Sequence, residues 1–346
     1  LLSRGLGDVY KRQGKYNIGI TAGIETTMAS GQFVEGLNRM NMNVVTSNHV
    51  KKVFESAQYQ KQFEDGRKEL LKSEKPIEVC FWGADTTVYK KTDEKVESID
   101  NVLNSIPEKF AFLFVGQWTH RNLYHDRKDI GNLIKTFSNS FKNKSPENRP
   151  CLLLKTSGVN FSVVDRDEIL GRIKQIQAEV GDNCPNVYLL HGELTPTEMN
   201  GLLNHEKVRV HVSFTHGEGF GHPLLLASLS GKPVLSSNWS GHLDFLKQGA
   251  VLLEGELKPV HESAADQFLL KEAKWFNINI TKALVKIKDV YKNYDKYKIE
   301  AFQLGKQNKL FCISVLVYES SKETLIKNVQ PISANIKQIP IDISNI

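Results

Sequence analysis

The chain has 346 residues, of which 40% are hydrophobic and 24% are charged, a balance typical of a soluble globular protein large enough for two domains. Its net charge of +6 arises from 45 basic and 39 acidic residues, so no nucleic-acid partner is expected. No apolar run reaches the roughly 18 residues that a transmembrane segment needs.

The first 13 residues, LLSRGLGDVYKRQ, have neither a starting methionine nor the apolar core of a signal peptide. They resemble translated sequencing adapter, so residues 1–13 are set aside as non-native, and the native start of the chain is expected to be missing.

In the first part of the chain, short apolar segments alternate with helical patterns. Strands are expected at 16–22, 43–46 and 78–82, and helices at 33–40 and 48–64. Three strands are few for a doubly wound sheet, so residues 14–108 are expected to form an incomplete first domain. The polar stretch 90–109 is the expected linker.

From residue 109 the alternation becomes regular. Strands are expected at 111–116, 151–155, 186–191, 208–214, 233–236 and 250–253. Helices are expected between them at 130–141, 166–180, 197–204, 224–230 and 241–246. This alternation predicts a parallel sheet covered on both faces, which binds ligands at the carboxyl ends of its strands. We expect this second domain to span 109–267, followed by helices over 268–330 and a tail over 331–346.

One stretch, THGEGFGHPLLLAS at 215–228, places a glutamate among three glycines before a proline and an apolar helix. Glycine permits close backbone approach, and proline is tolerated in the first turn of a helix. We therefore expect a loop that brings Glu218 and free amides to a helix N-terminus, which is a favourable place for a diphosphate. A dinucleotide fingerprint is rejected because its third glycine position falls on His222.

The longer stretch GEGFGHPLLLASLSGKPVLSSNWSGH resembles the signature of the retaining GT-B glycosyltransferases of family four, as encoded by marine bacteriophages and their bacterial hosts. The resemblance implies an α/β GT-B fold: two Rossmann-like domains whose parallel sheets face a cleft, the first domain here being incomplete. It also implies transfer of a hexose-type sugar from a nucleotide-diphosphate donor to a hydroxyl acceptor (a glycan, lipid or protein), with retention and without a metal or cofactor.

The same resemblance implies roles for the residues of this loop. Glu218 would contact hydroxyls of the donor sugar, and the segment after it would approach sugar and diphosphate through Gly219, Phe220, Gly221 and His222. Leu226 stands where the family has a second glutamate that binds the ribose. This departure keeps a second interpretation open, in which the chain is a non-catalytic sugar-nucleotide or glycan-binding relic of the fold.

Two further segments supply candidate cations for the donor. FLFVGQW and DRKDIGNLIKTF resemble the opening of the donor domain, where Gly116 ends a strand, Lys128 matches the family's lysine and Arg127 replaces its arginine. Glu218, Lys128 and Arg127 are therefore the expected catalytic residues, and Lys155 is a further phosphate-binding candidate at a strand end. A solvent-exposed helix start is the alternative for Arg127 and Lys128.

Additional candidates come from the edges of the expected cleft. SSNWSGHLDF offers Asn238, Ser240 and Gly241 as donor-binding residues, with His242 and Asp244 as helix-capping alternatives. The segment GITAGIETT resembles an acceptor-side loop and indicates Glu25 and Thr26, and the strand end in NVVTSNHV, which resembles the same enzymes, indicates Ser47 as a third acceptor-side residue. His49 is more typical of a helix start than of a catalytic base.

Two patterns are interpreted as structural. Asp165 and Asp167 match a metal-binding DxD pair, but Asp165 with Glu168 fits a capping box at a helix start better. The run VYKNYDKYKIEAF at 290–302 fits a helix with a tyrosine-rich packing face. The four cysteines form no CxxC pair, which favours a reducing, cytoplasmic location and no zinc site.

Overall fold

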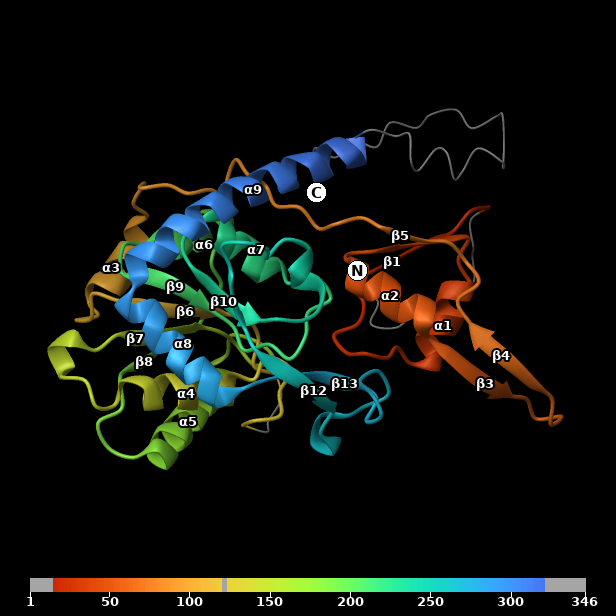
Figure 1. Ribbon diagram of the computed structural model, residues 1–346, viewed down its shortest axis with the longest axis horizontal. Helices are drawn as coiled ribbons and strands as arrows, with labels where there is room; N and C mark the ends of the chain where they lie inside the picture. The colour runs from red at the N-terminus through yellow and green to blue at the C-terminus, as the bar shows by residue number, and fades with distance from the viewer. Residues whose placement is uncertain (1–14, 120–122, 321–346) are drawn as a thin grey trace.

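The computed structural model describes residues 15–119 and 123–320, so residues 1–13 and the expected tail at 331–346 lie outside the described part. The described chain forms two parallel sheets, a six-stranded one and a three-stranded one, with helices packed on them (Figure 1). All nine strands expected from the alternation of apolar segments are present, within about three residues at either end.

The six-stranded sheet has the order β11-β10-β9-β6-β7-β8, and all its strands are parallel. Its strands are β6 (Ala111–Val115), β7 (Cys151–Lys155), β8 (Val187–Leu190), β9 (Val208–Val212), β10 (Val234–Ser237) and β11 (Val251–Leu253). The first strand lies in the middle, and the later strands add on either side. In sheets of this order, a ligand crevice forms outside the carboxyl ends of the central strands.

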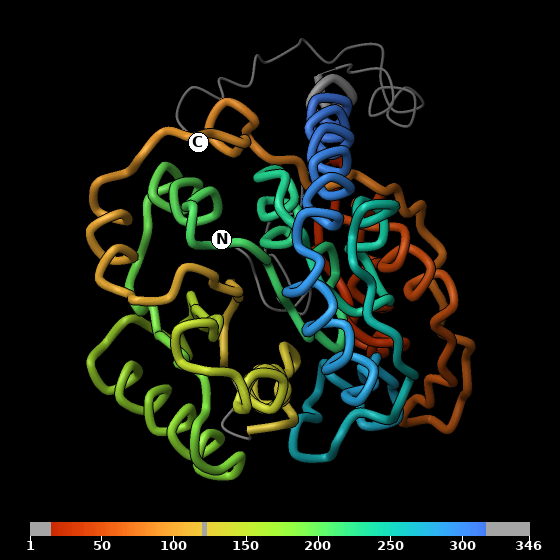
Figure 2. The backbone as a smooth tube through the Cα atoms, turned by 60° about the vertical axis from the view of Figure 1, so that its left-hand side comes forward, coloured from red at the N-terminus to blue at the C-terminus, as the bar shows by residue number. Residues whose placement is uncertain are grey.

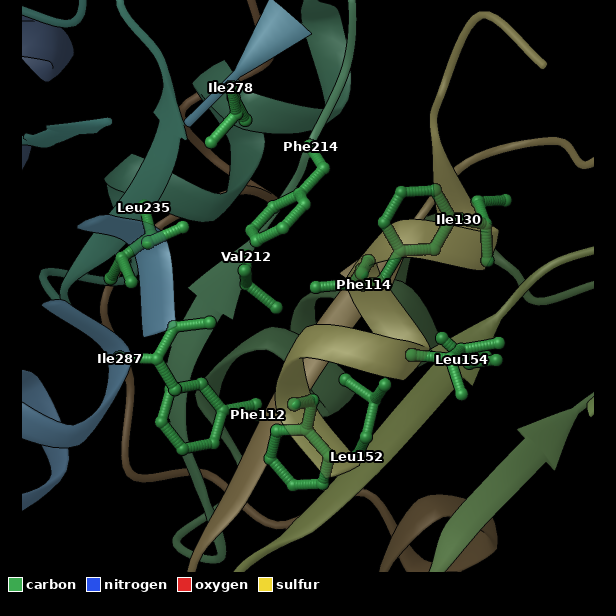
Figure 3. Packing of buried hydrophobic residues seen from close by; sticks show 14 of the residues in the cluster. Phe112, Phe114, Ile130, Leu152, Leu154, Val212, Phe214, Leu235, Ile278 and Ile287 are labelled. Atoms are coloured by element: carbon green, nitrogen blue, oxygen red, sulfur yellow. The ribbon is translucent and has the colours of Figure 1, made fainter. Parts of the chain in front are cut away.

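Helices cover both faces of this sheet, because successive side chains along its strands point to opposite faces and are apolar on both. On one face, Phe112 and Phe114 pack with α4 (Ile130–Phe141), α5 (Val163–Val180) and α8 (Ile280–Lys292), as Figure 3 shows in part. On the other face, Leu113 and Leu153 pack with helices that include α3 (Glu97–Asn104), α6 (Pro196–Asn204) and α7 (His222–Leu229). The site can therefore form only at the strand ends.

The smaller sheet has the order β1-β2-β5, with β1 (Ile18–Thr21), β2 (Met42–Val45) and β5 (Ile77–Val79) all parallel. The helices α1 (Gly31–Asn38) and α2 (Asn48–Ser56) pack on it through a separate apolar core. Ser47 caps α2, its hydroxyl accepting a hydrogen bond from the Val50 amide at 3.2 Å.

Several segments differ from the predictions. The helix expected over 48–64 ends at Ser56, and an antiparallel hairpin of β3 (Gln58–Gln62) and β4 (Lys68–Lys72) follows. Helices were expected from residue 268, yet β13 (Lys274–Ile278) pairs with β12 (Gly255–Pro259). The expected linker contains α3, and the helix expected at 241–246 is a short 3-10 turn over Gly241–Asp244. Further 3-10 turns span Pro146–Asn148 and Glu262–Ala264.

The helix α9 (Tyr294–Ser320) follows α8 and crosses α7 toward the first sheet (Figures 1 and 2). Phe311 of α9 packs on Phe81, with 5.1 Å between their ring centroids. A methyl group added to Gly83 would contact Val315 of α9. These contacts join α9 to the segment that follows β5. Across residues 15–119 and 123–320, no helix is both long and apolar enough to cross a bilayer.

The core prediction compares two leucines. Leu153 on β7 is 0% exposed, whereas Leu310 on α9 is 67% exposed. We expect Leu153→Ala to lower the free energy of unfolding by about 2–5 kcal/mol, because it leaves a cavity in the sheet core. Leu310→Ala should change it by less than about 0.5 kcal/mol. Urea denaturation measures both, and equal losses would contradict the assigned core.

Candidate functional site

The candidate site is a cavity of about 390 Å³ between the carboxyl ends of the six-stranded sheet and loops of the first part. Ten of the residues proposed from sequence line it: Glu25, Gly116, Arg127, Lys128, Lys155, Glu218, Gly219, Phe220, Gly221 and His222. Nine of them end or follow β6, β7 or β9, at the crevice that this strand order creates, and Glu25 lies on the loop after β1. A cavity of this size is within the range of small-ligand sites.

The loop that carries Arg127 and Lys128 is held in shape by a buried carboxylate on either side. Asp126 accepts hydrogen bonds from the amides of Lys128 at 3.0 Å and Ile130 at 3.3 Å. Asp129 precedes α4 with φ 50°, a left-handed conformation that aspartate tolerates better than most residues. This turn holds both basic residues at the cavity. Burial raises the pKa of Asp126 to about 6.

The turn at 215–221 packs so tightly that its glycines serve protein contacts. A Cβ on Gly217 would lie 2.1 Å from the Glu25 carbonyl oxygen, and one on Gly219 would lie 1.9 Å from that of Ala22. These two glycines therefore let the turn approach the loop after β1, whereas the sequence analysis expected glycine here to let the backbone approach a ligand. Gly221 adopts φ 91°, which favours glycine.

Four charged side chains meet beside this turn. The Lys128 ammonium donates to Glu218 Oε1, and Arg127 donates to Glu218 Oε2 at 3.2 Å and to the Gly217 carbonyl at 3.1 Å. Glu25 lies 3.7 Å from Arg127 and extends the network to the loop after β1. Two cations and two anions therefore neutralise one another. The cations expected to bind phosphate are already paired with the glutamate expected to bind the sugar.

Burial makes this network strong. Glu218 is 6% exposed and Lys128 is 8% exposed. Burial alone would raise the pKa of Glu218, but Lys128 and Arg127 offset it and lower that pKa to about 2. Burial lowers the pKa of Lys128, against the attraction of Glu218. Glu218 is thus ionised at neutral pH, and in this form both of its oxygens only accept hydrogen bonds.

The free amides expected at the turn are present. Within the described residues, the N–H groups of Gly219, Phe220, Gly221 and His222 have no hydrogen-bond acceptor. Consecutive free amides at the start of a helix form a concave site for an anion. Pro223, which has no N–H, follows at the second position of α7.

Lys155 lies at the end of β7 and lines the same cavity. Its ammonium donates to the Gly192 carbonyl at 2.5 Å and lies 5.1 Å from the centre of the Phe161 ring. It makes no salt bridge among the described residues. Glu218 and Glu25 are already paired with Arg127 and Lys128, so the positive charge of Lys155 is not neutralised by this network. Burial lowers its pKa from the usual value.

Five of the residues proposed from sequence do not line the cavity. Thr26 is buried and donates to the Met28 carbonyl at 3.0 Å, while Ser47 caps α2. Ser240 accepts the Glu218 amide at 2.9 Å, and the Gly241 amide donates to the Glu218 carbonyl at 2.9 Å. Ser240 and Gly241 therefore position the turn from behind it. Asn238 is exposed, and its amide bonds the Leu253 carbonyl.

The histidine and aspartate alternatives take structural positions. Asp244 caps α2 from the other part of the chain, accepting from the amide and side chain of Asn48, both at 2.9 Å. His242 is buried behind the turn and bonds the Ser237 carbonyl at 2.7 Å. His49 packs edge-on against Trp239, and burial lowers its pKa to about 4.

The predicted capping box at Asp165 is wrong, because α5 begins earlier and Ser162 caps it. Asp165 instead accepts from the amides of Gly158 and Val159, both at 2.9 Å, and pairs with His191 at 2.9 Å. It thereby anchors the loop that carries Ser157 along the cavity wall. In the described part of the chain, no three His, Cys, Asp or Glu side chains gather to hold a metal.

Other cavity residues were missed by the sequence analysis. The following side chains line the cavity: Trp82, Gln117, Thr156, Ser157, Phe161 and Met199. Gln117 lies in the FLFVGQW segment, although it was not proposed as a site residue. Met199 lies in α6, and the other four follow β5 or β7, a position that could have indicated them. Leu226 packs into the apolar core under α7 and does not line the cavity.

No protein-family model matches the chain, and no curated protein matches it. Solved structures do resemble it. HepE of Anabaena in complex with UDP and glucose shares 14% identity with a TM-score of 0.54, over 85% of this chain and 66% of that one. Sucrose-phosphate synthase of Thermosynechococcus elongatus shares 14% identity with a TM-score of 0.55, over 87% and 61%. TarM shares 15% identity with a TM-score of 0.56, over 92% and 51%.

These likenesses establish the fold. The chain has the α/β GT-B fold that the sequence predicted, with parallel sheets facing a cavity. It spans less than two thirds of the length of each of these three structures.

The charge network predicts how stability responds to acid. Because the pKa of Glu218 is lower in the folded chain, about 2 against 4.5, Glu218 stabilises the fold above about pH 4.5. This contribution, on the order of 3 kcal/mol, is lost as the pH falls toward 2. We expect Glu218→Gln to flatten the pH dependence of the free energy of unfolding between pH 5 and 2.5.

Urea denaturation at a series of pH values measures this dependence. Glu256→Gln, at an exposed position on β12, is the matched control and should leave the slope unchanged. The same slope in wild type and Glu218→Gln would show that Glu218 is not held by buried cations.

Proposed function

We propose that the chain is a glycosyltransferase that moves a sugar from a nucleotide-diphosphate donor to a hydroxyl acceptor, with retention at the anomeric carbon. The observation that carries this proposal is one cavity that holds an ionised glutamate, two paired cations, a further lysine and four free amides. The likeness to HepE, solved with UDP and glucose and with UDP-glucose, supports it.

In this proposal the diphosphate binds between Lys155 and the amides of residues 219–222. The amides start a helix, whose dipole favours an anion, and Lys155 makes no salt bridge among the described residues. Lys128 and Arg127 then interact with both the Glu218 carboxylate and the phosphates. Charge that develops on the departing diphosphate is stabilised by donors already in place. This is the part that a divalent cation plays in other diphosphate sites, so we propose that the reaction needs no metal or cofactor.

Glu218 is placed to hold the sugar ring. Each of its oxygens accepts one hydrogen bond from a cation, and a carboxylate has about four acceptor positions in total. Two positions therefore remain for hydroxyls of the donor sugar. Because Lys128 and Arg127 fix the carboxylate, a sugar gains these bonds without much loss of side-chain freedom.

The acceptor is proposed to enter from the side of the loop after β1. Glu25 lines the cavity there and is half-buried, so it can accept a hydrogen bond from the incoming hydroxyl. Trp82 and Ala22 complete this wall. All four cysteines are free thiols, and we propose a reducing, cytoplasmic location on that basis.

A second candidate is a binding protein that holds a sugar nucleotide without transferring the sugar. The position of Leu226, packed in the core, favours this candidate, because the family places its ribose-binding glutamate there. The two candidates share the donor cavity and differ only in turnover.

The donor site predicts which lysines matter for nucleotide affinity. We expect Lys155→Met and Lys128→Met each to weaken UDP binding about 10- to 100-fold, because a charge-assisted bond to phosphate contributes about 1.5–3 kcal/mol. Isothermal titration calorimetry measures the affinity. Lys174→Met, on the exposed side of α5, is the matched control and should bind UDP as wild type does. Unchanged affinity in both cavity variants would refute the diphosphate site.

Turnover distinguishes the two candidates. With UDP-glucose and a simple alcohol as acceptor, we expect proton NMR to detect an α-glucoside, and Glu218→Gln to lower the rate about 100- to 1,000-fold. A β-glucoside would contradict retention. UDP binding without any release of glucose would instead support the binding protein.

A further inference from the structure

A second cavity lies at the opposite ends of the strands of the six-stranded sheet. It has a volume of about 580 Å³, larger than the donor cavity. Arg209 reaches it from the second position of β9, Lys232 from the turn just before β10, and Lys298 from the first turns of α9. It therefore lies at the amino ends of β9 and β10, whereas the donor cavity lies at the carboxyl end of β9 and its neighbours.

The basic residues of this cavity lack anionic partners. Lys91, Arg209, Lys232 and Lys298 make no salt bridge within the described residues, although Asp93, Glu206 and Asp295 also line the cavity. The Lys232 ammonium donates only to the His205 carbonyl, at 2.7 Å. An ammonium has three donors, so two of them have no protein acceptor.

The charge around Lys232 is positive on balance. Burial, together with the charges of Arg209 and Lys298, lowers the pKa of Lys232 to about 7, and the opposing effect of Asp93 is smaller. A partly buried cation beside two other cations is unfavourable in the empty cavity. An anion that reached all three side chains would relieve this repulsion.

The walls of the cavity indicate a ligand with a flat or apolar part. The Arg209 guanidinium lies 5.6 Å from the centre of the Tyr294 ring, and the Lys91 ammonium lies 4.7 Å from that of Phe302. Ile299, which is 69% exposed, lies between these rings in sequence and also lines the cavity. Aromatic side chains beside cations suit a phosphate joined to a ring.

We propose that this cavity binds a small phosphorylated molecule, with Arg209, Lys232 and Lys298 on the phosphate and Tyr294 and Phe302 on its organic part. The site is independent of the donor cavity, because it uses the other ends of the strands and none of the donor-site residues.

Two probes test the proposal on the full chain by isothermal titration calorimetry: inorganic phosphate and phenyl phosphate. Both should bind, phenyl phosphate more tightly because of the aromatic walls, and both should still bind the Lys128→Gln variant, whose donor cavity has lost a cation. The double variant Arg209→Gln and Lys298→Gln should lose at least tenfold in affinity. Lys309→Gln, an exposed lysine later on α9, is the matched control and should not change it.

A second readout locates the ligand. Brief acetylation with acetic anhydride, followed by peptide mass spectrometry, should label Lys232, and phenyl phosphate should protect it while leaving the exposed Lys174 unprotected. No phosphate binding in Lys128→Gln, undiminished binding in the double variant, or labelling of Lys232 unaffected by ligand would each overturn the proposal. UDP also carries phosphates joined to a ring, so its affinity is compared between the two variants. A loss confined to Lys128→Gln reports on the donor cavity and a loss confined to the double variant reports on the second cavity, so failure of one site is distinguishable from failure of the other.

Discussion

The contact between Lys128 and Glu218 is the constraint on which the site depends. Each side chain is buried, and a buried charge is stable only beside a partner. One partner follows β6 and the other follows β9, and these strands are neighbours only because β6 lies at the centre of the sheet. Strand order, loop conformation and the ionisation of Glu218 are therefore linked through a single ion pair.

The same region joins the two parts of the chain. Gly217 and Gly219 let the turn lie against the loop after β1, and Glu25 extends the charge network across that contact. Asp244 adds a cap on α2 from the larger part. The cavity is therefore bounded by both sheets, and changes in the contact between them alter its shape. Arg209 and Lys232 lie at the opposite ends of these strands, and their charges are not neutralised by salt bridges among the described residues.

The sequence predicted most of the fold because buried parallel strands are apolar runs that helices separate, as at 111–116 and 151–155. It missed β13 because KWFNI has no clear alternation and pairs with β12 only through tertiary context. Within the site, the glycine-rich turn identified Glu218, the segment DRKDIGNLIKTF identified Lys128, and a strand end identified Lys155. Trp82 and Phe161 carry no motif, and the roles of Ser47 and Ser240 as hydrogen-bond acceptors for nearby amides depend on distances that no sequence pattern contains.

The central claim is that the turn after β9 receives a diphosphate through its free amides. Its most direct test is amide NMR of the isotope-labelled chain during titration with UDP. The account predicts that the largest shifts occur at the amides of Gly219, Phe220, Gly221 and His222, with the Lys155 ammonium shifting at the same UDP concentration. Saturable UDP binding that leaves these four amides unshifted and perturbs signals elsewhere would contradict it.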